Sequence, residues 1–390
     1  MLNLSNEQLE KLGAEITARE IGQQPDLWRE ALANYLENKE QIQAYLNEIE
    51  EQHERVKVIF SGAGSSAFVG EAIEDYLNRV NEKTKWEFEA VATTDILATP
   101  ELYLQKELPT LLVSFARSGN SPESVATVDL AQKSIDEFYQ LTITCAADGE
   151  LAVAAEGDDR NLVLLQPAKS NDAGFAMTGS FTSMMLTALL VFDTTANDDK
   201  LKWVDGSIEM AEQMLADEEI VNSIADLDFD RVVYLGQGGF FGLAHEAQLK
   251  LLELTAGKVA TLYETPLGFR HGPKSFVDEK TVIIVFGSND HYTKKYDTDL
   301  LNEVHHDKIA TKVLSLSVGE NKEVDADQFW FAEEYQTLPD VYLNFPYVVF
   351  AQLFSLAASI KEGIQPDDPS PAGTVNRVVQ GVIIHSHEEE

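Results

Sequence analysis

The sequence predicts an α/β protein of two tandem domains, each a mostly parallel sheet flanked by helices in three layers. Two observations predict this class. Short β-branched segments alternate with helical segments along most of the 390 residues, which is typical of a parallel sheet covered by helices. In addition, VIFSGAGSSAFVGEA resembles the later segment VVYLGQGGFFGLAHEA and aligns Gly62 and Gly64 with Gly236 and Gly238. Similarity at such a long spacing predicts a duplicated domain.

The first half begins with an N-terminal helical segment, residues 1–52, in which Leu32 and Leu36 lie four apart on one helical face. Residues 53–200 form the first predicted domain. Its expected strands are VKVIF, FEAVAT, TLLVSFA, YQLTIT and NLVLLQ, and an apolar helix over about 178–192 follows them.

The second predicted domain spans residues 201–366. An acidic stretch, 193–205, resembles a linker, and a helix is expected over about 207–225. The strand pattern then restarts in RVVYLGQGG, TVIIVFG, KVLSLSV and VYLNFP, before an apolar helix over about 348–360. Residues 367–390 form a C-terminal tail.

Composition excludes several kinds of partner. The chain has 29 Lys and Arg against 66 Asp and Glu, so its formal charge is 29 − 66 = −37. Such a polyanion is repelled by nucleic acids and by anionic membranes, and neither is an expected partner. One cysteine, Cys145, allows no intramolecular disulfide and no thiolate cluster for zinc. The N-terminus has no apolar run resembling a signal peptide, and the longest strongly apolar stretch, 184–192, is under half of the roughly 20 residues of a membrane-spanning helix. We therefore expect a cytoplasmic location.

Two loops carry the residues expected to bind an anion. The first, GAGSS, joins a predicted strand to a helix, and the second, ARSGNSPES, follows a later strand. Serine hydroxyls and amides at a helix N-terminus suit a phosphate monoester, although each serine alone is as readily explained as a helix cap. The candidate residues are Ser65, Ser66, Ser118 and Ser121.

A nucleotide-binding loop is the alternative for GAGSS. The third glycine of a dinucleotide fingerprint is replaced by Ala67, and a dinucleotide fold has no need of the second serine-rich loop. No GK[ST] sequence follows the glycines, which excludes a triphosphate-binding P-loop.

The second domain carries candidate proton-transfer groups. Glu246, Lys250 and Glu253 fall on one face of a predicted helix, and the loop LGFRHGPK exposes His271 between glycines. A solvated charge stripe remains an alternative, although the neighbouring leucines predict a largely buried helix. A carboxylate and an imidazole near a phosphate site are the groups needed to open a sugar ring and to move a proton between adjacent carbons. This chemistry requires no metal or organic cofactor.

The remaining histidines and the cysteine are not expected to be functional. His305 and His306, like His385 and His387, lack partner ligands at a metal-binding spacing. Cys145 lies in an expected strand, where a small core residue is more usual than a nucleophile.

The motifs GAGSS, ARSGNSPES, HEAQLKLLELTAGK and GFRHGPKS resemble the sugar isomerase (SIS) family. Three longer segments are similar to the AgaS group of that family, the tagatose-6-phosphate ketose/aldose isomerases now viewed as galactosamine-6-phosphate deaminases. These segments are TAREIGQQPDLW, ELTAGKVATLYETPLGFRHGPKS and PSPAGTVNRVVQGVIIH. The resemblance covers nearly the whole chain and implies two SIS domains.

The resemblance also implies roles for individual residues. Glu253 matches the carboxylate that shuttles a proton between C1 and C2 in the isomerase half of glucosamine-6-phosphate synthase. His271 matches its ring-opening histidine, which comes from the neighbouring subunit and so implies a homodimer or homotetramer. The tail of that relative supplies a Schiff-base lysine, whereas Arg377 stands at about that place here, and Ala116 replaces its first phosphate-loop serine. Arg117 or Arg377 is therefore expected to supply positive charge.

Together with the candidate residues, the resemblance implies deaminating isomerisation of D-galactosamine 6-phosphate to D-tagatose 6-phosphate and ammonia as the expected function. The alternatives are a plain tagatose-6-phosphate ketose/aldose isomerase and a non-catalytic sugar-phosphate sensor. The expected catalytic residues are Glu253 and His271. The expected substrate-binding or phosphate-binding residues are Gly64, Ser65, Ser66, Arg117, Ser118, Asn120, Ser121, Lys250 and Arg377.

Overall fold

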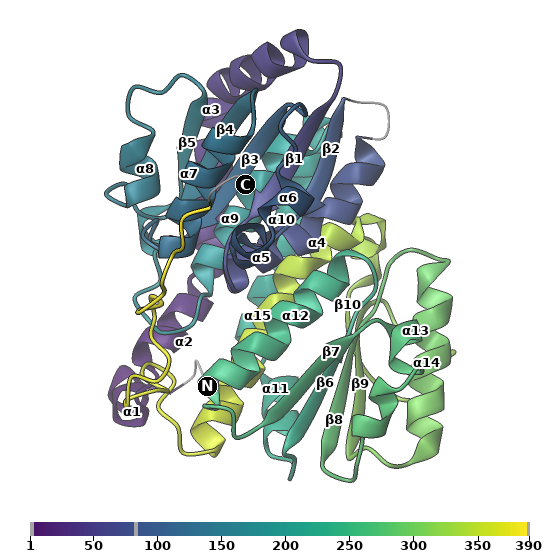
Figure 1. Ribbon diagram of the computed structural model, residues 1–390. Coiled ribbons are helices and arrows are strands. Elements are labelled where there is room, and N and C mark those ends of the chain that lie inside the picture. Colours follow the sequence, from purple (N-terminus) through teal and green to yellow (C-terminus); the bar gives the residue numbers. More distant parts are fainter. Residues whose placement is uncertain (1–3, 82–84, 388–390) are drawn as a thin grey trace. The chain divides into compact units, whose positions relative to one another are not determined.

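The computed structural model describes residues 4–81 and 85–387, which form two compact units that are treated separately below (Figure 1). Unit A comprises residues 26–173, 177–195 and 372–387. Unit B comprises residues 4–25, 174–176 and 196–371.

Unit A contains a parallel five-stranded sheet with the strand order β2-β1-β3-β4-β5. Its strands are β1 (Val56–Ser61), β2 (Trp86–Ala90), β3 (Thr110–Ala116), β4 (Phe138–Thr144) and β5 (Asn161–Leu165). Its helices are α3 (Gln24–Gln52, whose first two residues belong to unit B), α4 (Ser65–Val80), α5 (Thr93–Ala98), α6 (Pro100–Tyr103), α7 (Pro122–Ser134), α8 (Glu150–Ala154), η1 (Ala168–Ser170) and α9 (Gly179–Phe192). Every residue of β1 and β3 is buried, so these strands form the centre of the unit.

Unit B repeats this arrangement with the order β7-β6-β8-β9-β10, again parallel throughout. Its strands are β6 (Arg231–Leu235), β7 (Ala260–Glu264), β8 (Thr281–Phe286), β9 (Lys312–Val318) and β10 (Asp327–Phe331). Its helices are α1 (Asn6–Leu12), α2 (Glu15–Gly22), α10 (Asn197–Ala216), α11 (Glu219–Ala225), α12 (Gly239–Leu254), α13 (Pro266–Phe269), η2 (Pro273–Phe276), α14 (Thr293–Asp307), η3 (Glu333–Thr337) and α15 (Asp340–Lys361). Two parallel sheets flanked by helices confirm the predicted fold class.

Two local predictions were wrong. The segment VYLNFP is not a strand but part of α15, and β7 and β10 were not predicted. Residues 341–359 of α15 are all buried, so this helix has no polar face that would reveal its period. Most of the expected linker over 193–205 belongs to α10, whose first turn carries Asp198 and Asp199. Acidic residues at this position stabilise a helix through its dipole.

Helix α15 also passes a length and hydropathy test for a membrane span. It has 22 residues and a mean hydropathy of 1.5 over an 18-residue window, and 94% of that window is buried within the protein. In unit B it is a core helix that packs against α10, α11 and α12.

The glycine loops at the ends of β1 and β6 have the same backbone conformation. Gly64 has φ 57° and ψ −131°, and Gly238 has φ 58° and ψ −131°, in a region that favours glycine. In unit A, β1 and β3 are neighbours, and the chain continues from β1 to β2 on one side of this pair and from β3 to β4 on the other side. In unit B, β6 and β8 are related in the same way. The strand order therefore reverses between the two strands of each pair, which is the switch point of the sheet. Ligands of such sheets bind outside the carboxyl ends of the strands at this switch point.

A buried aspartate lies near the switch point of unit B. Asp297, in α14, is 3% exposed, and its Oδ2 accepts a hydrogen bond from the amide of Ser288. Burial, and then the negative charge of Asp340, raise the pKa of Asp297 to about 7, against the opposing effects of the Ser288 amide and Lys294. The folded state therefore holds a proton that the unfolded state releases at lower pH.

We expect Asp297→Asn to stabilise unit B more at pH 8 than at pH 5. The wild-type chain loses stability as the pH rises from about 4 to about 7, because unfolding releases the proton, and asparagine removes this loss. A shift of about three pKa units limits the effect to the order of 4 kcal/mol. Urea denaturation of both proteins at the two pH values measures it. Equal differences between variant and wild type at both pH values would contradict the prediction.

Candidate functional site

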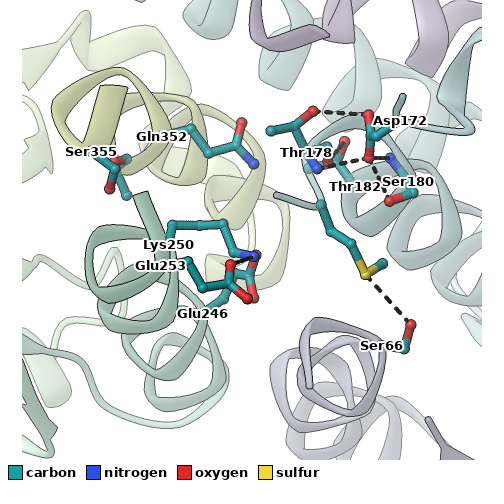
Figure 2. A network of polar contacts seen from close by, with 12 residues as sticks. Ser66, Asp172, Thr178, Ser180, Thr182, Glu246, Lys250, Glu253, Gln352 and Ser355 are labelled. Carbon is teal, nitrogen blue, oxygen red and sulfur yellow. Dashed lines mark hydrogen bonds and ion pairs between the residues drawn. The ribbon is translucent and has the colours of Figure 1, made fainter. Parts of the chain in front are cut away.

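The first serine-rich loop of unit A leads directly into α4. Ser65 and Ser66 are 4% and 5% exposed in the first turn of that helix. The Ser66 hydroxyl lies 3.8 Å from the sulfur of Met177 (Figure 2). Gly64 is exposed at the N-cap position, and a Cβ atom there would meet nothing within 4 Å. The loop thus leaves open space in front of the N-terminus of α4.

The second loop of unit A joins β3, the neighbour of β1, to α7. Ser121 is the N-cap residue of α7, but its side chain makes no capping hydrogen bond. This observation removes the simplest structural explanation for Ser121. The Ser118 hydroxyl accepts a hydrogen bond from the amide of Asn120 at 3.3 Å, and Asn120 Oδ1 accepts one from the amide of Glu150 at 2.9 Å. The Asn120 side chain therefore also holds the start of α8.

The C-terminal tail reaches the same part of unit A. Arg377 donates from Nε to the carbonyl oxygen of Asp172 at 3.0 Å and from Nη2 to Asn171 Oδ1 at 3.2 Å. Arg117, which is 8% exposed, donates to the carbonyl oxygen of Arg377 at 2.7 Å. The two arginines expected to supply positive charge are thus in direct contact beside the second serine loop.

Asp172 organises this region and was not predicted from the sequence. It is fully buried, and its carboxylate accepts hydrogen bonds from Thr178, Gly179 and Ser180 at the start of α9 (Figure 2). The N-terminal amides of α9 are therefore bound by an internal carboxylate. The sequence does not predict this contact, because the loop between Asp172 and α9 has no recognisable capping pattern.

Unit B contains a compact charged group on α12. Lys250 is 1% exposed, and its Nζ lies 2.7 Å from Glu253 Oε2 and 3.5 Å from Glu246 Oε1. The three side chains point toward one another (Figure 2). Glu246 is fully buried, whereas the Glu253 side chain is 24% exposed. The burial of Lys250 and Glu246 rules out the solvated charge stripe. Lys250 holds Glu253 in one place, and Glu253 remains open to solvent.

His271 lies in the exposed loop that follows α13 in unit B. Its amide donates to the carbonyl oxygen of Gly268 at 2.9 Å. On either side of it, Arg270 and Lys274 form ion pairs of 2.7 and 2.5 Å with Glu303 of α14. These ion pairs fix the ends of the loop and leave the imidazole accessible.

His306, His387 and Cys145 have structural contacts or surroundings. His306 lies 3.0 Å from Asp325, and His387 lies 2.8 Å from Glu101, both at the surface. Burial raises the pKa of the Cys145 thiol to about 12, which suits a core residue better than a nucleophile. Within residues 4–81 and 85–387, no three histidine, cysteine or acidic side chains are placed to hold a metal ion.

The structure distributes the predicted site residues over both units. Unit A carries those expected to bind phosphate, namely Gly64, Ser65, Ser66, Arg117, Ser118, Asn120, Ser121 and Arg377. Unit B carries Lys250, Glu253 and His271. Glu246 joins them as a partner of Lys250.

Comparison with known proteins gives clear relatives, although no family model matches the chain. The chain is 41% identical to the D-galactosamine-6-phosphate deaminase AgaS of Shewanella sp. (strain ANA-3), over 98% of this chain and 95% of the relative. It is 43% identical to the protein of the same name from Escherichia coli O157:H7, over 95% of each chain. The crystal structure of tagatose-6-phosphate ketose/aldose isomerase from Escherichia coli has a TM-score of 0.86 at 38% identity, covering 96% of this chain and 97% of that one.

Proposed function

The chain belongs to the AgaS group of the sugar isomerase (SIS) family, and from this premise we propose that it converts D-galactosamine 6-phosphate and water to D-tagatose 6-phosphate and ammonia. The observation that carries the proposal is Glu253, a carboxylate open to solvent and held by the buried Lys250, in a chain whose relatives are named for this reaction. The reaction belongs to the breakdown of amino sugars.

The reaction requires one proton to move between adjacent carbons. In the open-chain sugar a base removes the proton from C2, and the electron pair forms the C1–C2 double bond of an enolamine while the C1 oxygen is protonated. Return of a proton to C1 gives an imine at C2. Water adds to this imine, and ammonia leaves, which produces the ketose. Glu253 is the proposed base and proton carrier, and His271 the proposed acid and base for ring opening.

The phosphate is proposed to bind on unit A. The N-termini of α4 and α7 and the hydroxyls of Ser65, Ser66, Ser118 and Ser121 offer hydrogen-bond donors to a dianion. Gly64 allows close approach of the backbone, and Asn120 shapes the second loop. Arg117 and Arg377 add positive charge beside the second serine loop of a protein whose formal charge is −37.

We expect the galacto substrate to yield equal amounts of ammonia and tagatose 6-phosphate. The test follows both products from galactosamine 6-phosphate, with glucosamine 6-phosphate in parallel and with tagatose 6-phosphate supplied alone. Absence of ammonia together with aldose formation from tagatose 6-phosphate would instead support plain isomerisation, the activity named for the related Escherichia coli structure. Binding without turnover of any of the three would support a sensor.

Self-association is the second part of the proposal, as a homodimer or homotetramer. The resemblance places the ring-opening histidine in the neighbouring subunit. On unit B, the rings of Phe241 of α12 and Tyr263 of β7 are in contact and partly exposed, and Leu252 of α12 and Leu267 of α13 are 37% and 40% exposed. These apolar side chains lie on α12, β7 and α13, which precede the His271 loop, and they support an interface there.

Mixing two inactive variants tests this assembly. If His271 serves the Glu253 of its partner, mixed assemblies of Glu253→Gln and His271→Ala chains contain sites with both wild-type residues. An equal mixture refolded or co-expressed as a dimer should recover roughly a quarter of wild-type activity. The doubly substituted chain mixed with either single variant is the control without recovery. Mixed assemblies that form, as shown by native mass spectrometry, yet remain inactive would contradict the exchange of His271.

A cytoplasmic location without nucleic-acid or membrane partners completes the proposal. The formal charge of −37 supports it, because phosphate backbones and anionic lipid surfaces both repel such a chain.

A further inference from the structure

Unit B has a loop at the position that the second serine loop occupies in unit A. It comprises residues 287–292, which join β8 to α14. Strand β8 lies beside β6 as β3 lies beside β1, so this loop also stands at the switch point of its sheet. It presents a serine hydroxyl and backbone amides at the carboxyl end of a buried strand, which are the groups that bind anions in such folds.

The donors of this loop are already bound to carboxylates of the same unit. Asp340 Oδ1 accepts from the amide of Asn289 at 2.7 Å, and Asp340 Oδ2 accepts from the Ser288 hydroxyl at 2.5 Å. Asp297 Oδ2 accepts from the amide of Ser288 at 3.1 Å. A carboxylate that spans a hydroxyl and an adjacent amide with its two oxygens uses the loop as a phosphate would.

The surrounding structure keeps the two acids and the loop in place. Asp340 lies in the first turn of α15, and Asp297 lies within α14, so regular helices position both. The Asn289 side chain donates to the carbonyl oxygens of Tyr335 and Leu338 at 3.1 and 3.0 Å, which fixes the loop against the segment that leads into α15. The helices and these hydrogen bonds therefore hold the two acids and the loop in defined positions.

We infer that this loop of unit B is an anion-binding loop whose anion is supplied by the chain itself, with Asp340 in the position of a phosphate. An external dianion would have to displace Asp340 from both of its donors, and Asp297 already accepts from the neighbouring Ser288 amide. Unit B consequently takes no sugar phosphate. We therefore assign one phosphate to each chain, on unit A, and this assignment rests on the proposed function.

The test removes the internal anion and counts bound phosphate. Asp340→Ala frees the Ser288 hydroxyl and the Asn289 amide, and Asp297→Asn keeps an oxygen for the Ser288 amide while removing the second ionisable carboxyl group. Inorganic phosphate is titrated into the wild type and the double variant, followed by calorimetry, and crystals of both are grown in phosphate. Asp327→Asn is the matched control, because it removes a negative charge from an exposed ion pair on β10.

The double variant should bind one more phosphate per chain than the wild type, located at residues 288–289, and Asp327→Asn should bind the wild-type number. Phosphate at this loop in the wild type, or a folded double variant with no phosphate there, would overturn the inference. The single Asp340→Ala and Asp297→Asn chains provide folded alternatives if the double variant fails to fold, with the same two outcomes. The number of phosphates that the double variant binds in excess of the wild type tests this inference. The number that the wild type itself binds tests the phosphate site proposed on unit A.

Discussion

Replacing Glu253 by glutamine is expected to abolish turnover while leaving sugar-phosphate binding nearly unchanged. Glutamine keeps the shape of the side chain and an oxygen that can accept from Lys250 Nζ, now 2.7 Å from Glu253 Oε2. It cannot take a proton from C2. General-base catalysis typically contributes a factor of about 10² to 10⁴, and here the same carboxylate also returns the proton, so we expect a loss at the upper end of that range.

The measurement separates binding from chemistry. Turnover is followed as ammonia release, and affinity is measured with tagatose 6-phosphate, whose phosphate is proposed to bind on unit A. In deuterated water, the proton that Glu253 carries can exchange with solvent before it is returned to C1. The wild-type product should therefore contain deuterium at C1 to the extent of this exchange, and the variant should form no deuterated product. Glu219→Gln, an exposed acid on α11, is the control for loss of one charge. A normal rate in the Glu253 variant would remove this residue from the mechanism.

The phosphate loops and the α12 group could be predicted because their signals are local. Gly64 and Ser65 adjoin in the chain, and Glu246, Lys250 and Glu253 follow the helical period, so spacing alone brings them to one loop or one face. Spacing could not show that Lys250 is buried between its partners. That result depends on the packing of α12 against α15 within unit B.

The contacts that sequence reasoning missed join residues through tertiary structure. Asp340 binds Ser288 from more than fifty positions away, and no pattern near either residue reports the contact. The error in VYLNFP has a related cause, because full burial of α15 removes the polar positions from which a helical period is read. Local chemistry was therefore predictable, whereas buried carboxylates and all-apolar elements required the fold.

Asp172→Ala is expected to destabilise unit A strongly. The carboxylate is fully buried and accepts five hydrogen bonds, from the amides of Thr178, Gly179 and Ser180 at 2.8, 3.1 and 2.9 Å and from the hydroxyls of Thr178 and Ser180 at 2.9 and 2.6 Å. Alanine leaves these buried donors without an acceptor. Each unsatisfied buried group costs about 1–3 kcal/mol, and partial relaxation reduces the sum, so we expect a loss of about 4 kcal/mol or more.

Thermal and urea denaturation monitored on unit A give the size of this loss, which should lower its midpoint by roughly 10 °C or more. Asp172→Asn retains one acceptor oxygen and should lose less than the alanine variant, while Asp159→Ala, an exposed acid of the same unit, should have little effect. Because Arg377 donates to the backbone of Asp172, loosening of this loop should also weaken phosphate binding in variants that still fold. An unchanged midpoint for Asp172→Ala would show that the donors at the start of α9 find other acceptors, and that the Asp172 carboxylate does not anchor this helix.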